Sequence, residues 1–246
     1  MLRVRWLWIF LDTPEPESDE AWRFWAAVTR STLSARRGAD GEFATLLPAG
    51  GAAWVKVQRV GHGGGVHLDL DVDDVAAAAI VAEGLGATRI GAIGQTVVIL
   101  RSPGGFVFCL TTWRPDRAGE RQHRAGEPDL LDQVCLDIRA TPTDRYAAEL
   151  AFWAALTGWE PGRYDAEYGY LTPPRGIPAR ILLQRTGAAD EVPVQGHVDF
   201  ASQDRAASVA AHVREGATVE TEHPQWTVLR DPVGRRYCIT HRHVGG

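Results

Sequence analysis

Apolar and polar residues alternate most clearly between positions 66 and 72 of the chain. Every second residue there is aliphatic, and the residues between them are His67, Asp69 and Asp71. A period of two is typical of a strand with one buried face. We therefore expect the aliphatic side chains to pack on a helix and the three polar side chains to lie on the opposite face of a sheet.

A helical pattern precedes this strand. Apolar residues spaced i, i+1, i+4 and i+7 predict a helix with one buried face that includes two tryptophans. Ser18 or Asp19 is placed to cap its N-terminus. The expected buried positions are Ala21, Trp22, Trp25 and Val28.

An Ala-rich segment after position 72 predicts a second helix. Asp73 is placed to cap it, and Gly84 or Gly86 to end it. Alternation and turn residues predict further strands along the chain. The expected strands are 3–11, 41–47, 52–60, 96–101, 106–111, 133–139, 168–171, 179–184, 197–201, 226–230 and 236–241, with two more helices at about 143–156 and 204–215.

Six short blocks of sequence recur in the same order 126 to 130 residues later. So many blocks at a nearly constant shift indicate an internal duplication. The pairs are Phe24–Thr29 with Phe152–Thr157, Gln58–Arg59 with Gln184–Arg185, His67–Asp69 with His197–Asp199, Gly86–Thr88 with Gly216–Thr218, Leu100–Pro103 with Leu229–Pro232, and Phe108–Thr111 with Tyr237–Thr240.

The segment between the copies, Arg114–Pro128, is rich in Arg, Glu, Gly and Pro and has the composition of a linker. We therefore predict one domain at 1–115, a linker at 116–129 and a second domain at 130–246. Each copy divides again into two halves, and each half reads as a strand, a helix and two or three strands. This order predicts an α+β fold, since strands of mixed direction would be covered by helices on one side.

The bulk composition limits which kinds of partner and which compartment are expected for the protein. A net charge of −5 and a pI of about 5.9 argue against electrostatic attraction to nucleic acid. Three cysteines without C-x-x-C spacing predict reduced thiols in a cytoplasmic protein. The apolar stretch 6–11 is too short for a signal-peptide core, and no segment approaches the roughly 20 apolar residues of a membrane span. We expect a cytoplasmic monomer or homodimer with no nucleic-acid or membrane partner.

Three local patterns accompany the repeats. They are the Phe-Trp-Ala-Ala helix, a Gln-Arg followed shortly by His-x-Asp, and Asp-Pro-x-Gly-x-x-Tyr-Cys at 231–238, of which 102–109 is a degraded form. Together they resemble the vicinal oxygen chelate superfamily, most closely its two-domain actinobacterial proteins of the glyoxalase-like and bleomycin-resistance type. The resemblance covers nearly the whole chain outside the linker.

The resemblance implies two tandem domains, each built from paired βαβββ modules that form a curved mixed sheet. The concave face of such a cup holds a ligand or a divalent metal in relatives. Alternation then places His67 and Asp69 in the first cup, and His197 and Asp199 in the second.

The resemblance also identifies positions that often carry metal ligands in relatives. The first-strand positions are Trp6 in copy one and Gln133 in copy two. The usual carboxylate position on the last strand, by the pattern, holds Val107 and Arg236. Because valine cannot ligate and a guanidinium puts positive charge where a cation would sit, we expect neither a metal nor another cofactor.

Several side chains have two readings. His67 and His197 are either hydrogen-bonded structural residues or a general base or donor, since imidazole titrates near neutrality. The strand tryptophans Trp6, Trp8, Trp54 and Trp226 either pack against helices or line a cup suited to flat aromatic ligands. Cys109 and Cys238 are expected to be buried packing residues, because neither has a histidine partner nearby in the sequence.

Three functions remain open on the sequence. The first is metal-independent binding of a small apolar or aromatic metabolite by a pocket that includes the strand tryptophans, the His-x-Asp pairs, Gln133 and Arg236. The alternative is an enzyme of lyase, isomerase or dioxygenase type, either metal-dependent through Gln133 and His197 or metal-free with His197 or His67 as catalyst. In a third, one copy only supports the other. Copy two keeps the fuller Asp-Pro-x-Gly pattern and is the better candidate for the working copy.

Overall fold

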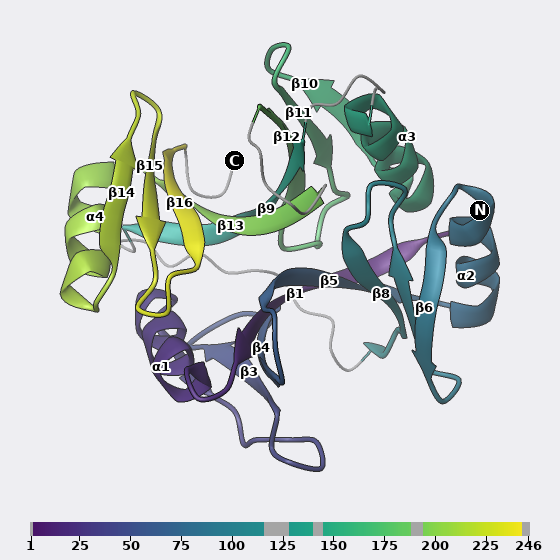
Figure 1. Cartoon of the computed structure of the whole chain (residues 1–246), viewed down its shortest axis with the longest axis horizontal. Helices are drawn as coiled ribbons and strands as arrows, with labels where there is room; N and C mark the ends of the chain where they lie inside the picture. Colours follow the sequence, from purple (N-terminus) through teal and green to yellow (C-terminus); the bar gives the residue numbers. More distant parts are fainter. Residues whose placement is uncertain (1, 116–127, 140–144, 188–193, 243–246) are drawn as a thin grey trace. The chain divides into compact units, whose positions relative to one another are not determined.

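Sixteen strands form two eight-stranded sheets of the same topology in this computed structural model, which describes residues 2–115, 128–139, 145–187 and 194–242 (Figure 1). The first sheet has the order β2-β3-β4-β1-β5-β8-β7-β6, and the second the order β10-β11-β12-β9-β13-β16-β15-β14. The described residues also contain four helices. The predicted α+β class and internal duplication are confirmed.

The bounds of the elements are as follows. The helices are α1 Ser18–Val28, α2 Val75–Gly84, α3 Arg145–Thr157 and α4 Arg205–Arg214. The first sheet contains β1 Val4–Pro14, β2 Ser31–Leu33, β3 Phe43–Pro48, β4 Val55–Val60, β5 Gly65–Val72, β6 Thr88–Ile93, β7 Val97–Arg101 and β8 Val107–Thr112. The second contains β9 Asp129–Arg139, β10 Glu160–Arg163, β11 Tyr168–Thr172, β12 Arg180–Thr186, β13 Val194–Ser202, β14 Thr218–Glu222, β15 Trp226–Arg230 and β16 Arg236–His241.

The alternation at 66–72 is a strand, as predicted. Leu68 and Leu70 of β5 are fully buried, and β5 pairs in parallel with β8. In Figure 1, α2 lies along one face of the strands β6 to β8. The four residues predicted for the buried face of α1 are all buried as well.

Two predicted caps are wrong. Helix α1 begins at Ser18, and Glu17 occupies its N-cap without a side-chain hydrogen bond. Helix α2 is capped by Asp74, whose carboxylate accepts from the Ala77 amide at 3.0 Å. Asp73 instead forms an ion pair with Arg5, with 2.9 Å between Oδ1 and Nε. With two adjacent aspartates, the cap is the one in extended conformation directly before the first helical turn.

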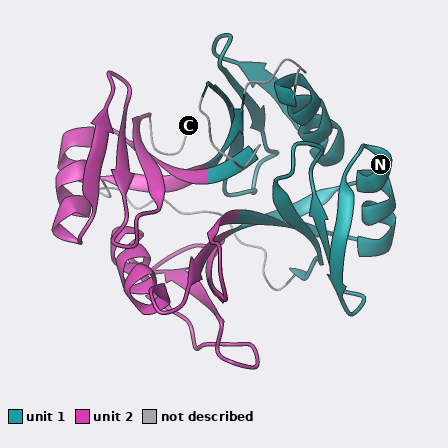
Figure 2. Ribbon diagram, in the orientation of Figure 1, with its two compact units in different colours: residues 1–9, 67–118, 134–196 teal, residues 10–66, 119–133, 197–246 magenta. Residues whose placement is uncertain are grey.

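The density of contacts divides the chain into two units that cut across the duplication (Figure 2). Unit 1 contains Met1–Ile9, His67–Ala118 and Val134–Gly196, and unit 2 contains Phe10–Val66, Gly119–Gln133 and His197–Gly246. Each unit therefore combines parts of both copies. Most of the predicted linker, residues 116–127, and the expected start of the third helix, residues 140–144, lie outside the described residues.

In unit 1, helix α3 of copy two packs on strands of copy one. Trp153 meets Phe108 with ring centroids 5.1 Å apart and Phe106 at 6.0 Å. A Cβ at Gly104 would lie 2.6 Å from Val194 Cγ2 and 2.8 Å from Glu149 Oε1, so only glycine fits this approach of the turn to the helix. The α3 contact is thus a close-packed core between segments distant in sequence.

In unit 2, helix α1 of copy one packs on strands of copy two. The Trp25 ring lies 5.2 Å from that of Tyr237 and is stacked on Phe200 at 6.4 Å. Trp25 Nε1 also donates to Asp231 Oδ2 at 2.9 Å. Trp22 and Trp25, expected in the core, are both buried, as is Trp153 in unit 1.

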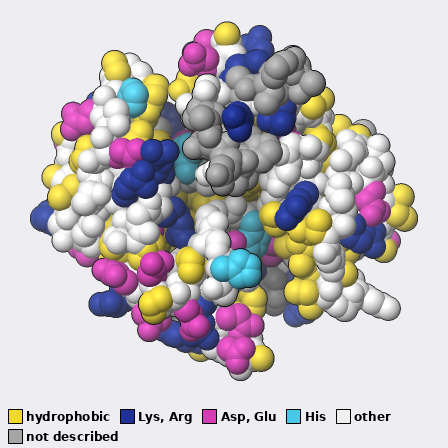
Figure 3. Space-filling model, viewed as in Figure 1, with side chains coloured by type: hydrophobic (Ala, Val, Ile, Leu, Met, Phe, Trp, Pro, Cys, Tyr) yellow, Lys and Arg dark blue, Asp and Glu magenta, His cyan; other side chains and the backbone are white. Residues whose placement is uncertain are grey.

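The surface has no single sign of charge. Acidic and basic side chains are interspersed on the face drawn in Figure 3, in keeping with a net charge of −5. Within the described ranges, no helix combines the length and the apolar character that a bilayer crossing demands.

Candidate functional site

Strands β13 and β16 of unit 2 bring together a histidine, an aspartate and a cysteine. The strands pair in parallel, with Asp199 opposite Cys238. Val198 and Phe200 are fully buried on the opposite side of β13, so His197 and Asp199 share the other face. His197 Nε2 lies 3.2 Å from Asp199 Oδ1 and 3.6 Å from Cys238 Sγ.

Gln133 completes this group from the neighbouring strand β9. Its side-chain amide donates to the second carboxylate oxygen, Asp199 Oδ2. Gln133 and Asp199 are both buried, and both carboxylate oxygens of Asp199 have polar contacts with neighbouring side chains. The resulting chain, Gln133–Asp199–His197–Cys238, is the central feature of this face of unit 2.

The same face continues across β15 as three cross-strand pairs. Trp226 is opposite Thr240, Val228 is opposite Cys238, and Arg230 is opposite Arg236. Residues directly opposite in a sheet share one face. An indole therefore stands at one end of the face, the thiol in the middle and two guanidinium groups at the other end.

The two guanidinium groups share one carboxylate. Glu220 of β14 accepts from Nε of Arg230 at 2.9 Å and from Nε of Arg236 at 2.9 Å. The hydrogen bond from Arg236 holds the pKa of the Glu220 carboxyl below its usual value. Two cations with one anion leave a net positive charge at this end of the face.

Unit 1 contains a related but different group. Ligand atoms of His67, Asp69 and Cys109 all lie within 4.8 Å of one another, and His67 Nε2 is 3.6 Å from Asp69 Oδ1. Asp71 is fully buried and accepts from Trp8 Nε1 at 3.1 Å and from the Thr111 hydroxyl at 2.5 Å.

The four tryptophans predicted on strands lie in different parts of the two units. Trp6 and Trp8 of β1 form an edge-to-face pair in unit 1, with centroids 6.1 Å apart, and both are buried. Trp54 was predicted on a strand but lies just before β4, outside the strand, where it is buried. Trp226 is half-buried and stacks on His223, with centroids 4.5 Å apart. Of the four, only Trp226 shares its sheet face with His197 and Cys238.

The cysteines are the residues that sequence reasoning undervalued. The last-strand pattern singled out Arg236, whereas the residue in hydrogen-bonding distance of His197 is Cys238, two positions further along. The signal was present in the sequence, because Cys109 and Cys238 recur at one repeat position together with the repeated His-x-Asp. Parallel pairing of β13 with β16, which the sequence does not reveal, supplies the contact.

A second polar group lies on β9, β11 and β12 in unit 1. Gln184, from the repeated Gln-Arg block, donates to the Tyr168 hydroxyl at 3.0 Å. Cys135 Sγ lies 3.8 Å from Gln184 Oε1. These side chains add hydrogen-bonding groups to this sheet, of which sequence analysis had named only Gln184, as part of a repeated block.

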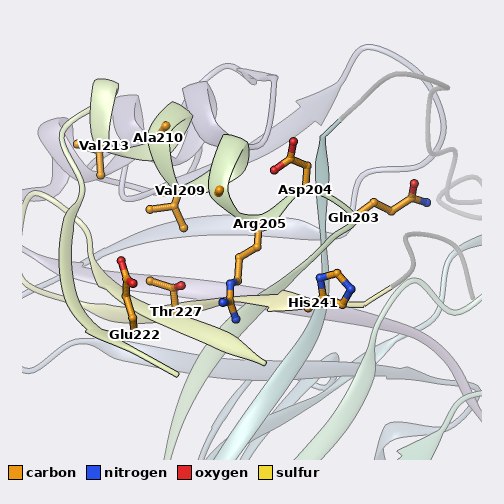
Figure 4. A pocket seen from close by; sticks show the side chains of 10 residues that line it. Gln203, Asp204, Arg205, Val209, Ala210, Val213, Glu222, Thr227 and His241 are labelled. Atoms are coloured by element: carbon orange, nitrogen blue, oxygen red, sulfur yellow. The ribbon is translucent and has the colours of Figure 1, made fainter. Parts of the chain in front are cut away.

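An open groove on the helix side of unit 2 has a volume of about 640 Å³. It runs between α4 and the strands β14 to β16 (Figure 4). Arg205, Val209, Glu222, Thr227 and His241 line it among others. Thr227 faces α4 and Trp226 the opposite side, so the groove is separate from the His197 face.

The sequence model of the glyoxalase-like domain family matches residues 8–111 and again 133–240. The two matches follow the duplication. No protein of established function matches the sequence significantly.

Solved structures with the same fold include enzymes of two kinds. A Mn(II)-bound glyoxalase from Novosphingobium aromaticivorans is 16% identical, with a TM-score of 0.67 over 98% of this chain and 83% of that one. A 2,2',3-trihydroxybiphenyl 1,2-dioxygenase from Sphingomonas wittichii strain RW1 is 11% identical, with a TM-score of 0.63 over 100% and 92%. An extradiol ring-cleaving dioxygenase from B. fuscum is 12% identical, with a TM-score of 0.64 over 99% and 73%. The fold is thus that of the vicinal oxygen chelate superfamily.

A metal in this fold has to be tested against the donor atoms present. Manganese and iron centres are built from imidazole and carboxylate, whereas thiolate selects softer ions such as zinc. Unit 1 offers His67 and Asp69 with a thiol, and its first-strand position is Trp6, which has no lone pair to give. In unit 2 Asp199 Oδ2 accepts from Gln133, and Oδ1 lies 3.2 Å from His197 Nε2. Each of these two groups thus offers one imidazole and one carboxylate, where a non-haem iron centre commonly uses two imidazoles and a carboxylate.

Proposed function

We propose that this chain, which belongs to the glyoxalase-like domain family, binds a small apolar or aromatic metabolite on the face of β13, β15 and β16 that carries His197, without a bound metal. The observation that carries the proposal is the row formed by Trp226, Val228 and Arg230 beside Cys238 and His197. The row places an indole and an aliphatic side chain beside polar and charged groups, which could orient a small ligand.

The half-buried Trp226 supports an aromatic ligand. An accessible indole provides a flat surface for stacking, worth about 0.5–1.5 kcal/mol beyond the area it buries. His223 already stacks on this ring, so a ligand would add a further ring or replace the imidazole. Val228 extends the apolar surface toward the thiol.

The charged end of the row supports an oriented ligand. Arg230 and Arg236 hold Glu220 between them and leave one positive charge in excess. A ligand with its ring on Trp226 would place a polar or anionic substituent near these guanidinium groups. Copy one has Val97 and Val107 where copy two has Trp226 and Arg236, which supports copy two as the binding copy.

The proposal is tested by titrating 2-naphthol into the wild type, Trp226→Ala and Val97→Ala by calorimetry. Loss of the indole should weaken binding by about ten-fold or more. Val97→Ala, the matched change at the equivalent position of copy one, should leave the Kd unchanged.

Thermal melts confirm that each variant is folded before titration. The proposal fails if the wild type shows no saturable binding, or if Trp226→Ala binds 2-naphthol as tightly as the wild type does. A Trp226→Phe variant, which keeps an aromatic face, should retain most of the affinity.

A further inference from the structure

Cys238 is held at the end of a chain of polar contacts that ligand stacking alone does not require. Its sulfur lies 3.6 Å from His197 Nε2, and the same nitrogen lies 3.2 Å from Asp199 Oδ1. The other oxygen of that carboxylate accepts from Gln133. Side chains from three strands therefore fix the imidazole beside the thiol.

The order of these contacts favours negative charge on the sulfur. His197 Nε2 is within hydrogen-bonding distance of the sulfur, so the neutral imidazole with Nε2 unprotonated can accept the thiol proton. The imidazolium formed in this way lies 3.2 Å from Asp199 Oδ1, whose negative charge stabilises it. A neighbouring imidazolium is one of the environments that stabilise a thiolate, which is the nucleophilic form of cysteine.

The sulfur lies on the ligand face. Val228 is directly opposite Cys238, and Trp226 follows two residues away on the same side of β15. A flat ligand on Trp226 and Val228 would meet the sulfur. We propose that Cys238 adds covalently to a small ligand that carries an α,β-unsaturated carbonyl group, an inference that rests on the proposed binding function.

The addition balances within the site. The sulfur forms a bond to the β-carbon of the ligand, and the carbon–carbon π bond breaks toward the α-carbon. The thiol proton passes to His197 Nε2 and is returned from there to the α-carbon. No oxidant, reductant or metal takes part.

Copy one provides an internal reference. Cys109 occupies the equivalent position, but His67 and Asp69 are 3.6 Å apart, against 3.2 Å for His197 and Asp199. Cys109 and Cys238 are buried to the same extent as residues. Cys109 is therefore expected to react more slowly than Cys238, because its neighbouring His–Asp pair is less tightly held and not because the thiol is less exposed.

The experiment uses N-ethylmaleimide at limiting concentration on the full chain, with the labelling rate of each of the three cysteines followed by peptide mass spectrometry. In the wild type Cys238 should be labelled faster than Cys109. His197→Asn should lower the labelling rate of Cys238 by about ten-fold and leave the labelling rate of Cys109 unchanged. The matched variant His67→Asn should leave the Cys238 rate unchanged.

Equal Cys238 rates in the wild type and in His197→Asn would overturn the proposal. If that variant fails to fold, all three thiols will react together at their rate in urea. Asp199→Asn, which keeps the imidazole, then serves as the second variant, and an unchanged Cys238 rate in it would also overturn the proposal.

The same set of proteins separates this inference from the proposed function. Saturable 2-naphthol binding with no acceleration at Cys238 would remove the covalent step and leave the binding function intact. Accelerated labelling at Cys238 without any 2-naphthol binding would remove the aromatic site and leave a reactive thiol.

Discussion

Each unit contains a buried carboxylate that accepts from a tryptophan N–H, but the carboxylate belongs to a helix in unit 1 and to a turn in unit 2. In unit 1 it is Glu149 of α3, which accepts from Trp153 Nε1 at 2.8 Å and from the Gly104 amide at 2.5 Å. In unit 2 it is Asp231 of the turn before β16, which accepts from Trp25 Nε1. Ser102 and Ala21 stand at the complementary positions. Both copies thus satisfy the buried indole N–H, from opposite partners.

Removing Glu149 should destabilise the protein strongly. Glu149→Ala leaves two buried N–H donors without an acceptor, at a cost of about 2–4 kcal/mol in the free energy of unfolding, measured in urea. Glu160→Ala, at an exposed position of β10, is the control and should change little. A loss of less than about 0.5 kcal/mol in Glu149→Ala would show that these hydrogen bonds contribute little.

Glu149 also predicts a pH dependence. Burial raises the pKa of its carboxyl in the folded state. Because the folded value lies above the unfolded one, stability is greatest below the unfolded pKa of about 4.3 and falls as pH rises through the folded pKa. Glu149→Gln, which keeps an acceptor, should remove that part of the decline.

At the scale of elements, strong periodicity predicted most of the secondary structure. Strands β15 and β16 begin and end where the sequence predicted, and α4 begins one residue after its expected start because Asp204 is the N-cap. The short strands β2 and β10 and the edge strands β6 and β14 were not predicted individually. Their residues are mostly exposed, so no alternation marks a buried face.

The site was harder to predict than the elements. Alternation correctly put His197 and Asp199 on one face, since it depends only on the pleat of one strand. The pairing of β13 with β16 and the donation from Gln133 to Asp199 depend on sheet order. The register between two strands 40 residues apart is not visible in the local sequence. The contact of Cys238 with His197 could therefore be found only in the structure.

At the scale of the whole molecule, the two copies share their cores. Helix α1 of copy one packs on Phe200 and Tyr237 of copy two, and α3 of copy two packs on Phe106 and Phe108 of copy one. A copy separated from the other would expose these aromatic surfaces to water.

Separately produced chains of residues 1–115 and 130–246 should therefore fail to fold on their own. We expect little near-UV circular dichroism from either one and recovery of a native-like spectrum when the two are mixed. Cooperative unfolding of residues 1–115 alone would contradict the shared cores. The intact chain, measured in parallel, is the reference.

We propose that ligand binding by this chain is independent of a metal. The most direct measurement is calorimetric titration of 2-naphthol into chelator-treated wild-type protein, repeated after addition of Mn²⁺, Fe²⁺ or Zn²⁺. Saturable binding to one site, with the same Kd with and without each ion, is the predicted result. Binding that is absent after chelation and restored by one of the ions would contradict the claim and assign the histidines to a metal centre.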